Sequence, residues 1–184
     1  MKKTIFTFLP ILVIFCACSK NSEKNGVTTD PYSGTYHLKF TVNDPWFLYN
    51  SLSGFPALTK TPEAWVIHQE TNGQYSIKTT TGPNFNAVFY NATTSVVLIQ
   101  QASPILNEQL FTFEKVNGSN LVNIKSLLDN KYVVIHYGLD ASGNINRWEI
   151  TVENKASTCT ADFSGSYPTP VSTGCQFDFE LVKQ

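Results

Sequence analysis

A threefold internal repeat limits how this chain can fold more than any other feature of the sequence. Three segments place an apolar residue, one intervening residue, Leu or Ile, and then Lys in the same order: GTYHLKF at 34–40, GQYSIKT at 73–79 and NLVNIKS at 120–126. Alternation of this kind is the period of a strand with one buried face. The repeat therefore predicts three equivalent strands, whose outward-facing residues include Lys39, Lys78 and Lys125.

Two further elements follow each of these strands in the same order. A second run starts at Pro45, Phe85 and Lys131, and aligns Tyr49 with Tyr90 and Tyr137. The last element of each unit carries large apolar residues two apart, at Trp65 and Ile67, Phe111 and Phe113, and Phe177 and Phe179. The middle unit adds a continuous apolar run from Ser95 that suits a buried strand. Each unit is therefore expected to supply about four strands.

Turn residues mark the boundaries between the units. Asn72-Gly73 and Asn117-Gly118 separate consecutive units, and both residue types tolerate the positive φ of a tight reversal. The chain shows no long helical period with caps, and its apolar runs of four to eight residues end at Gly, Pro, Asn or Asp. The expected fold class is all-β.

This order of segments resembles the β-trefoil, and within it the ricin-type lectin family, whose units end in Gln-x-Trp. The segments that carry the resemblance are Gln109-Leu110-Phe111, Glu63-Ala64-Trp65 and Cys175-Gln176-Phe177. The resemblance covers residues 34–184 and implies three pseudo-repeats around a shared aromatic core. An alternative fold is an eight-stranded lipocalin-like barrel, because Ser33-Gly34-Thr35-Tyr36 is similar to the opening of that family.

The first thirty residues have the pattern of an export signal. Lys2 and Lys3 precede an apolar run over 5–15, which is too short to cross a hydrocarbon core that needs ~20 residues. The run ends in Phe15-Cys16-Ala17-Cys18-Ser19, which resembles a bacterial lipobox with Cys18 as the lipidated residue; an ordinary cleaved signal is the alternative. We expect a signal peptide at 1–17, a polar tether at 18–32 and one domain at 33–184, held by lipid at the outer membrane of the bacterial cell envelope, on its periplasmic or surface side.

Two cysteines are then left in the mature domain. Cys159 and Cys175 enclose a stretch rich in Gly, Pro, Ser and Thr, and an oxidising compartment favours a disulfide between them. The bridge would bracket an insertion near 159–175 in the third unit. Two free thiols are the alternative.

Charge and composition exclude one class of partner. Thirteen Lys and Arg balance fourteen Asp and Glu, for a net charge of -1, so the chain lacks the basic surface that binds nucleic-acid phosphates. Charged residues make up only 15% and aromatic residues 13% of the chain, which is typical of an exported β-protein.

Six residues are candidates for ligand binding. The galactose site of the ricin-type family needs an acid that this chain lacks, since Val134 stands near the expected position in the third unit. A less specific carbohydrate site would use acids and amides between the first and second strands of the units, with an aromatic residue for stacking. A second candidate site is an exposed cation beside an aromatic residue. The candidates are Asp44, Trp46, Asn84, Asp129, Arg147 and Trp148. Each also has a structural interpretation, as a turn former or a core residue.

The sequence lacks the usual marks of catalysis. His37, His68 and His136 fall in different repeat positions without metal-ligand spacing, and the chain has neither a Gly-x-Ser-x-Gly elbow nor a glycine-rich phosphate loop before a helix. We therefore expect no enzyme, metal or cofactor, and a membrane-anchored module that binds a glycan or a protein. The alternatives are a Kunitz-like protease inhibitor acting through the loop 162–174 and a lipocalin-like carrier of a small apolar ligand.

Overall fold

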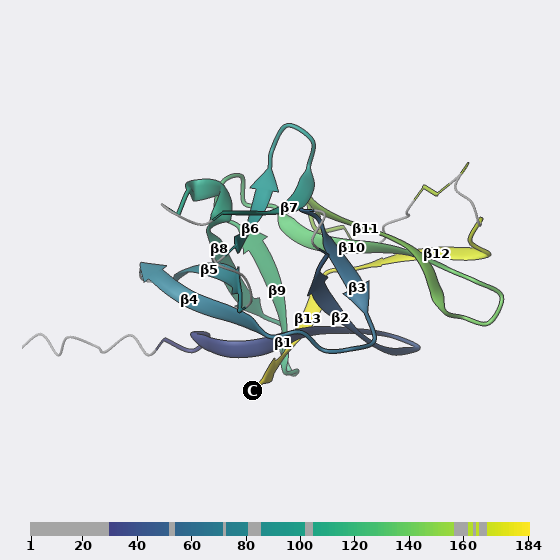
Figure 1. Cartoon of the computed structure of the whole chain (residues 1–184), viewed down its shortest axis with the longest axis horizontal. Coiled ribbons are helices and arrows are strands. Elements are labelled where there is room, and N and C mark those ends of the chain that lie inside the picture. Colours follow the sequence, from purple (N-terminus) through teal and green to yellow (C-terminus); the bar gives the residue numbers. More distant parts are fainter. Residues whose placement is uncertain are drawn as a thin grey trace, which may run out of the picture.

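The computed structural model describes residues 30–51, 54–71, 73–80, 86–101, 105–156, 162–163, 165 and 169–184 (Figure 1). The expected signal peptide with Cys18, most of the tether, Asn84 and Cys159 lie outside the described residues. Within them, none of the helical structure is long and apolar enough to cross a membrane. The elements are β1 (Gly34–Val42), β2 (Asp44–Asn50), β3 (Pro56–Thr59), β4 (Trp65–Thr71), β5 (Gln74–Thr79), β6 (Asn86–Asn91), β7 (Val96–Gln101), η1 (Asn107–Gln109), β8 (Phe111–Lys115), β9 (Leu121–Ser126), β10 (Tyr132–Leu139), β11 (Ile145–Glu153), β12 (Ser172–Gln176) and β13 (Asp178–Lys183).

Six of the strands close into a barrel. Antiparallel pairing runs from β1 to β4, β5, β8, β9 and β13, and β13 pairs back with β1. These are the first and last strands of the three sequence repeats. Closure leaves none of these six strands as a free sheet edge.

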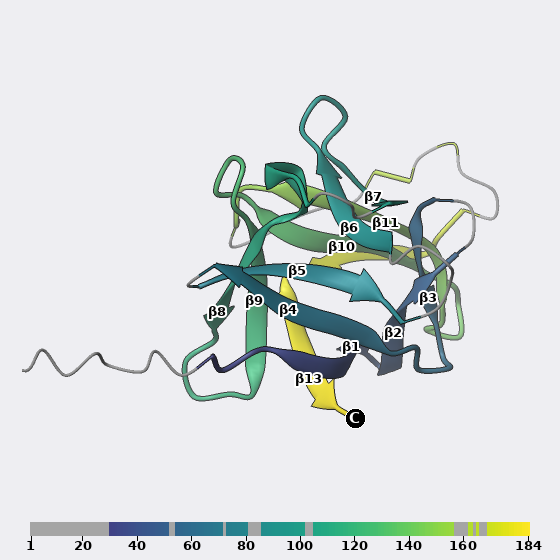
Figure 2. The ribbon, with the colours of Figure 1, turned by 60° about the vertical axis from the view of Figure 1, so that its left-hand side comes forward.

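The second and third strands of each repeat form a hairpin that leaves the barrel. The hairpins are β2 with β3, β6 with β7, and β10 with β11. They converge where Leu48, Val88 and Val133 meet the barrel residues Leu38 and Ile77 around a residual cavity of only about 10 Å³. In Figures 1 and 2 the hairpins lie together on one side of the barrel. A six-stranded barrel covered by three hairpins is a β-trefoil, which confirms the predicted fold and excludes the eight-stranded alternative.

The repeat residues fill the core as predicted in the first and last strands. Leu38, Ile77 and Ile124 are each at most 2% exposed, and the aromatic residues Trp65 and Phe111 are fully buried. Gly73 and Gly118 both have a φ of 75°, as tight reversals between units require. The repeat thus locates the strands that build the barrel.

The predicted alignment of the second strands is wrong. Tyr90 is fully buried, whereas Tyr49 is 39% exposed, and Leu48 is the β2 residue that packs beside Val88 of β6 at the centre. Because side chains alternate across a strand, a shift of one residue moves a side chain to the opposite face. Tyr49 is therefore a surface residue of the β2–β3 hairpin.

The three repeated lysines pair between the units, which the sequence did not indicate. The ammonium groups of Lys39, Lys78 and Lys125 lie 2.7, 2.8 and 3.1 Å from the carboxylates of Glu180, Glu70 and Glu114. In each case the acid comes from a last strand, β13, β4 or β8, that pairs with the lysine's own strand. Equivalent ion pairs therefore join the three seams between units.

The insertion in the third unit adds a strand that the sequence did not predict. β12 pairs with β10, from Ile135 opposite Gln176 to Leu139 opposite Ser172. Pro170, which precedes β12, also packs closely on β10, since a Cβ at Gly138 would meet its ring at 2.5 Å. Because Cys159 is outside the described residues, its bridge to Cys175 stays a prediction.

Candidate functional site

Asp44 and Trp46 take structural places in the first hairpin. Asp44 is the first residue of β2 and forms an exposed ion pair with Lys60 at 3.0 Å. Trp46 is only 9% exposed, and the same lysine ammonium lies 4.2 Å from the centroid of its ring. This arrangement leaves little of the Trp46 indole open for stacking on a sugar.

Asp129 is held in the turn between β9 and β10. Its carboxylate accepts a 2.8 Å hydrogen bond from the hydroxyl of Tyr90 and pairs with Lys131 at 3.1 Å. Burial by itself would raise the pKa of Asp129, but the hydrogen bonds from Tyr90 and Lys131 outweigh it and lower that pKa. Asp44 and Asp129 therefore lie in different repeats, and each forms an ion pair with a lysine of its own repeat.

Arg147 and Trp148 lie in β11, opposite Gly138 and Tyr137 of β10. Trp148 is 40% exposed, whereas Trp46 and Trp65 are in the core. The Nε of Arg147 is buried without a hydrogen-bond partner among the described residues. Of the six candidate residues, this pair is the one that presents an aromatic surface to solvent.

Trp148 forms one wall of a groove between hairpins, which we call the aromatic groove. It has a volume of about 320 Å³ and is lined by Phe55, Pro56, Val97, Trp148, Glu149 and Ile150, from the start of β3 and from β7 and β11. Phe55 is 52% exposed. Tyr49, which is 39% exposed, does not line the groove but lies in β2 opposite Ala57, the second residue after Phe55 along the chain.

Contacts on both sides of residues 52 and 53, which lie outside the described residues, fix the backbone next to Phe55. Gly54 has a φ of 81°, and its carbonyl accepts a 2.8 Å hydrogen bond from the N–H of Ile99 in β7. The hydroxyl of Ser51 donates to the carbonyl of Phe55. Pro56 then fixes its own φ and begins β3. Phe55 is not among the site residues predicted from the sequence, although a large apolar residue between Gly54 and Pro56 is a signal for an exposed turn.

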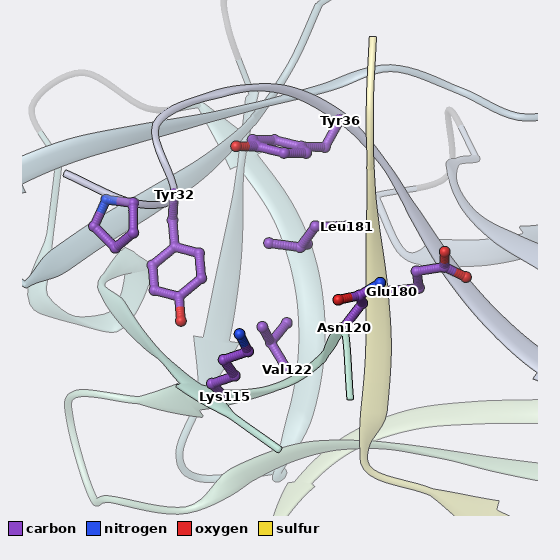
Figure 3. Close-up of a pocket in the computed structure, with 8 residues that line it drawn as sticks. Tyr32, Tyr36, Lys115, Asn120, Val122, Glu180 and Leu181 are labelled. Carbon is purple, nitrogen blue, oxygen red and sulfur yellow. The ribbon is translucent and has the colours of Figure 1, made fainter. Parts of the chain in front are cut away.

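A second hollow opens at the barrel and is called the barrel-end cleft (Figure 3). It has a volume of about 410 Å³, and its lining includes Tyr32, Tyr36, Lys115, Asn120, Val122 and Leu181. These residues come from the chain before β1 and from β1, β8, β9 and β13, with Asn120 just before β9. Tyr32 packs on the core, with its ring centroid 5.1 Å from that of Phe113. The barrel-end cleft shares no lining residue with the aromatic groove.

The histidines do not gather into one centre. The Nδ1 of His37 lies 2.9 Å from the carbonyl of Glu63, and the Nε2 of His136 lies 2.7 Å from the carboxylate of Glu153. In the described part of the chain, no three His, Cys, Asp or Glu side chains are grouped as metal ligands would be.

The comparisons bear on the fold. No protein-family model matches the chain, and no curated protein matches it. Among solved structures, the chain is similar to a proteinase inhibitor from Coprinopsis cinerea, with 13% identity and a TM-score of 0.50 over 83% of this chain and 99% of that one. At this identity the likeness concerns the fold alone. Strand pairing and comparison agree, and the protein is an all-β trefoil.

Proposed function

We propose that this β-trefoil is a non-catalytic binding module that inhibits a proteinase, with Phe55 as the side chain that enters the enzyme's specificity pocket. The observation that carries the proposal is the 52% exposure of a phenylalanine on a loop held at Ser51 and Gly54. The similar solved structure is a proteinase inhibitor, which supports this choice of target.

The aromatic groove has the composition of a binding hot spot. Large aromatic side chains supply most of the binding energy at protein interfaces because they bury much apolar area at low entropic cost. The aromatic side chains at or beside this groove, Tyr49, Phe55 and Trp148, are each at least 39% exposed. The hairpins β2–β3 and β10–β11 that carry them extend from a closed barrel, and such pre-organisation reduces the cost of binding.

The side chain at the tip indicates the class of enzyme. An apolar slot in the specificity pocket accepts a large aromatic residue, whereas a pocket with a buried acid selects Lys or Arg. Phe55 therefore favours a proteinase of chymotrypsin-like specificity. The loop 162–174, the alternative expected from the sequence, lies partly outside the described residues, and Pro170 within it packs on β10.

A panel of purified proteinases of chymotrypsin-like, trypsin-like and elastase-like specificity tests this function. We expect the full chain to inhibit the first class, and Phe55→Ala to weaken inhibition by about 100-fold, the loss typical of a hot-spot residue. Leu106→Ala is the matched control, since Leu106 is 47% exposed and lies outside the groove lining. This variant should inhibit as strongly as the parent. Inhibition that survives Phe55→Ala unchanged, or no inhibition of any class, would reject the proposal.

Glycan binding is the second candidate, and the 40% exposure of the Trp148 indole favours it. An exposed indole can stack on the apolar face of a sugar. A glycan array with the full chain and with Trp148→Ala separates the two functions. Glycan binding that is lost in Trp148→Ala and retained in Phe55→Ala favours the second candidate.

We also propose that Cys18 carries a lipid that tethers the domain to the cell envelope. The support is the lipobox-like sequence before Cys18 and the polar composition of the residues that follow. Replacement by Cys18→Ser should release the protein from the membrane fraction. Membrane association that persists in this variant would contradict lipidation at Cys18.

A further inference from the structure

The barrel-end cleft is lined by polar side chains that the folded chain does not use. The hydroxyls of Tyr32 and Tyr36, the amide of Asn120 and the ammonium group of Lys115 have no hydrogen-bond or ion-pair partner among the described residues. In Figure 3, Lys115 reaches into the cleft, and Val122 and Leu181 form its apolar floor. A hollow with a few converging polar groups over an apolar surface is the usual form of a small-molecule site.

Lys115 differs from the repeated lysines of the barrel. Lys39, Lys78 and Lys125 each have a carboxylate partner within 3.1 Å, whereas Lys115 has none in the described chain. The acid beside it in the sequence, Glu114, is already paired with Lys125. An ammonium group at the mouth of a cleft without a protein carboxylate is free to pair with a ligand.

The acids near the cleft are engaged elsewhere. Glu180 lies at its wall, but its carboxylate points away in Figure 3 and pairs with Lys39 at 2.7 Å. The carboxylate of Asp30 accepts hydrogen bonds from the N–H groups of Tyr32 and Ser33. Protein carboxylates therefore do not neutralise Lys115, and each of the four polar groups that line the cleft can donate a hydrogen bond to a ligand.

The phenol of Tyr36 is one of these donors. Tyr36 is 7% exposed, and this burial, together with the charge of Asp30, raises the pKa of its hydroxyl above the usual value. The hydroxyl therefore keeps its proton at neutral pH. Tyr36 and Lys115 lie on opposite sides of the cleft in Figure 3, so a ligand between them would meet a neutral phenol and an ammonium group, which suits an acceptor that carries negative charge.

We propose that the barrel-end cleft binds a small carboxylate carried on a six-membered ring, with Lys115 pairing with the carboxylate and Tyr32, Val122 and Leu181 contacting the ring. A volume of about 410 Å³ suits one such ring. Uronic acids and aromatic acids both carry this chemistry. The barrel-end cleft is separate from Phe55, so this proposal does not depend on proteinase inhibition.

The test is a titration of the ¹⁵N-labelled full chain, followed by NMR, with sodium glucuronate and with sodium phenylacetate. Glucose and benzyl alcohol serve as the uncharged ring controls. We expect at least one acid to shift amide signals around Lys115, Asn120 and Leu181, and to bind about 10-fold more tightly than its neutral counterpart. Glucuronate alone would indicate an acidic sugar, and phenylacetate alone an aromatic acid.

Substitutions identify the groups responsible. Lys115→Gln should lower the affinity for the acid by about 10-fold, and Tyr36→Phe should lower it by a smaller factor. Lys60→Gln, at an exposed lysine outside the cleft lining, should leave the affinity unchanged. Phe55→Ala should also bind normally, which separates this site from the proposed inhibition. The proposal would be overturned if neither acid bound at about 10 mM, if the neutral rings bound as tightly as the acids, or if Lys115→Gln left the affinity for the acid unchanged.

Discussion

Trp65 shows how one side chain joins a hairpin to the barrel. Its ring is fully buried at the start of β4, and its indole N–H donates a 3.0 Å hydrogen bond to the carbonyl of Leu48 in β2. The same residue therefore fills core volume and bonds the barrel to the backbone of the hairpin.

Trp65→Phe is expected to lower the free energy of unfolding by about 2 kcal/mol, because it leaves a cavity and removes the hydrogen bond from the indole to Leu48. Trp148→Phe is the matched control, and the 40% exposure of Trp148 predicts a change of less than about 0.5 kcal/mol. Urea unfolding followed by circular dichroism measures both. Equal losses in the two variants would show that Trp65 does not have this role.

Individual residues also mark how far sequence reasoning reaches. The alternation around Leu38, Ile77 and Ile124 predicts their burial, because period and residue type depend on the local chain. Gly54 and Pro56 indicate a turn at Phe55, but the groove that Phe55 lines depends on where β7 and β11 lie, which no local pattern contains. The core position of Trp46 is likewise a tertiary outcome, since an aromatic residue near a turn fits either a core or a binding site.

At the scale of elements, ion pairs join the barrel strands of successive units. Glu70 of β4 accepts hydrogen bonds from Lys78 and Ser76 of β5, at 2.8 and 2.6 Å. Burial alone would raise the pKa of Glu70, but these bonds outweigh it and lower that pKa below its ordinary value of 4.5. The charged form therefore stabilises the fold above the unfolded-state pKa, and this contribution is lost as pH falls through the folded-state pKa.

Glu70→Gln should therefore flatten the acid limb of the stability curve. The variant is expected to be less stable than the parent at pH 7, by up to about 1 kcal/mol for a partly exposed pair, and to approach it as the pH drops below 4.5. Urea midpoints from pH 7 to about pH 3 measure this difference. Glu149→Gln, at an exposed acid in β11, is the control. A stability difference between Glu70→Gln and the parent that stays constant from pH 7 to about pH 3 would contradict the pairing.

The elements themselves were predictable to different degrees. The repeats locate β1, β5 and β9 and the last strands of each unit, because these strands have one buried face. The second strands were misaligned, since a shift of one residue between Tyr49 and Leu48 cannot be detected without the partner strand. β12 escaped prediction because its sequence, STGCQ, lacks apolar alternation, and its pairing with β10 holds it in place.

For the whole molecule, the trefoil separates two surfaces. The hairpins β2–β3 and β10–β11 frame the aromatic groove, whereas barrel strands surround the barrel-end cleft. The closed barrel between them supplies the rigidity on which both proposals depend. Binding at one surface is therefore expected to leave the other unchanged.

The predicted bridge between Cys159 and Cys175 belongs to the same scale, because it would fasten the insertion to the trefoil. Closing a loop of this length stabilises a protein by about 3 kcal/mol in the chain-entropy model. Reduction should therefore lower the free energy of unfolding by about that amount, and the non-reduced chain should show no thiols at these two positions by alkylation and peptide mapping. Quantitative alkylation of both cysteines before reduction would contradict the bridge.

The central claim is that Phe55 enters the specificity pocket of a proteinase, and a change of specificity tests it most directly. Inhibition constants of the parent and of Phe55→Arg should be measured against a chymotrypsin-like and a trypsin-like enzyme. We expect Phe55→Arg to inhibit the chymotrypsin-like enzyme about 100-fold more weakly than the parent and to gain inhibition of the trypsin-like enzyme, because a specificity pocket with a buried acid accepts Arg. Constants that stay the same for both enzymes would contradict it.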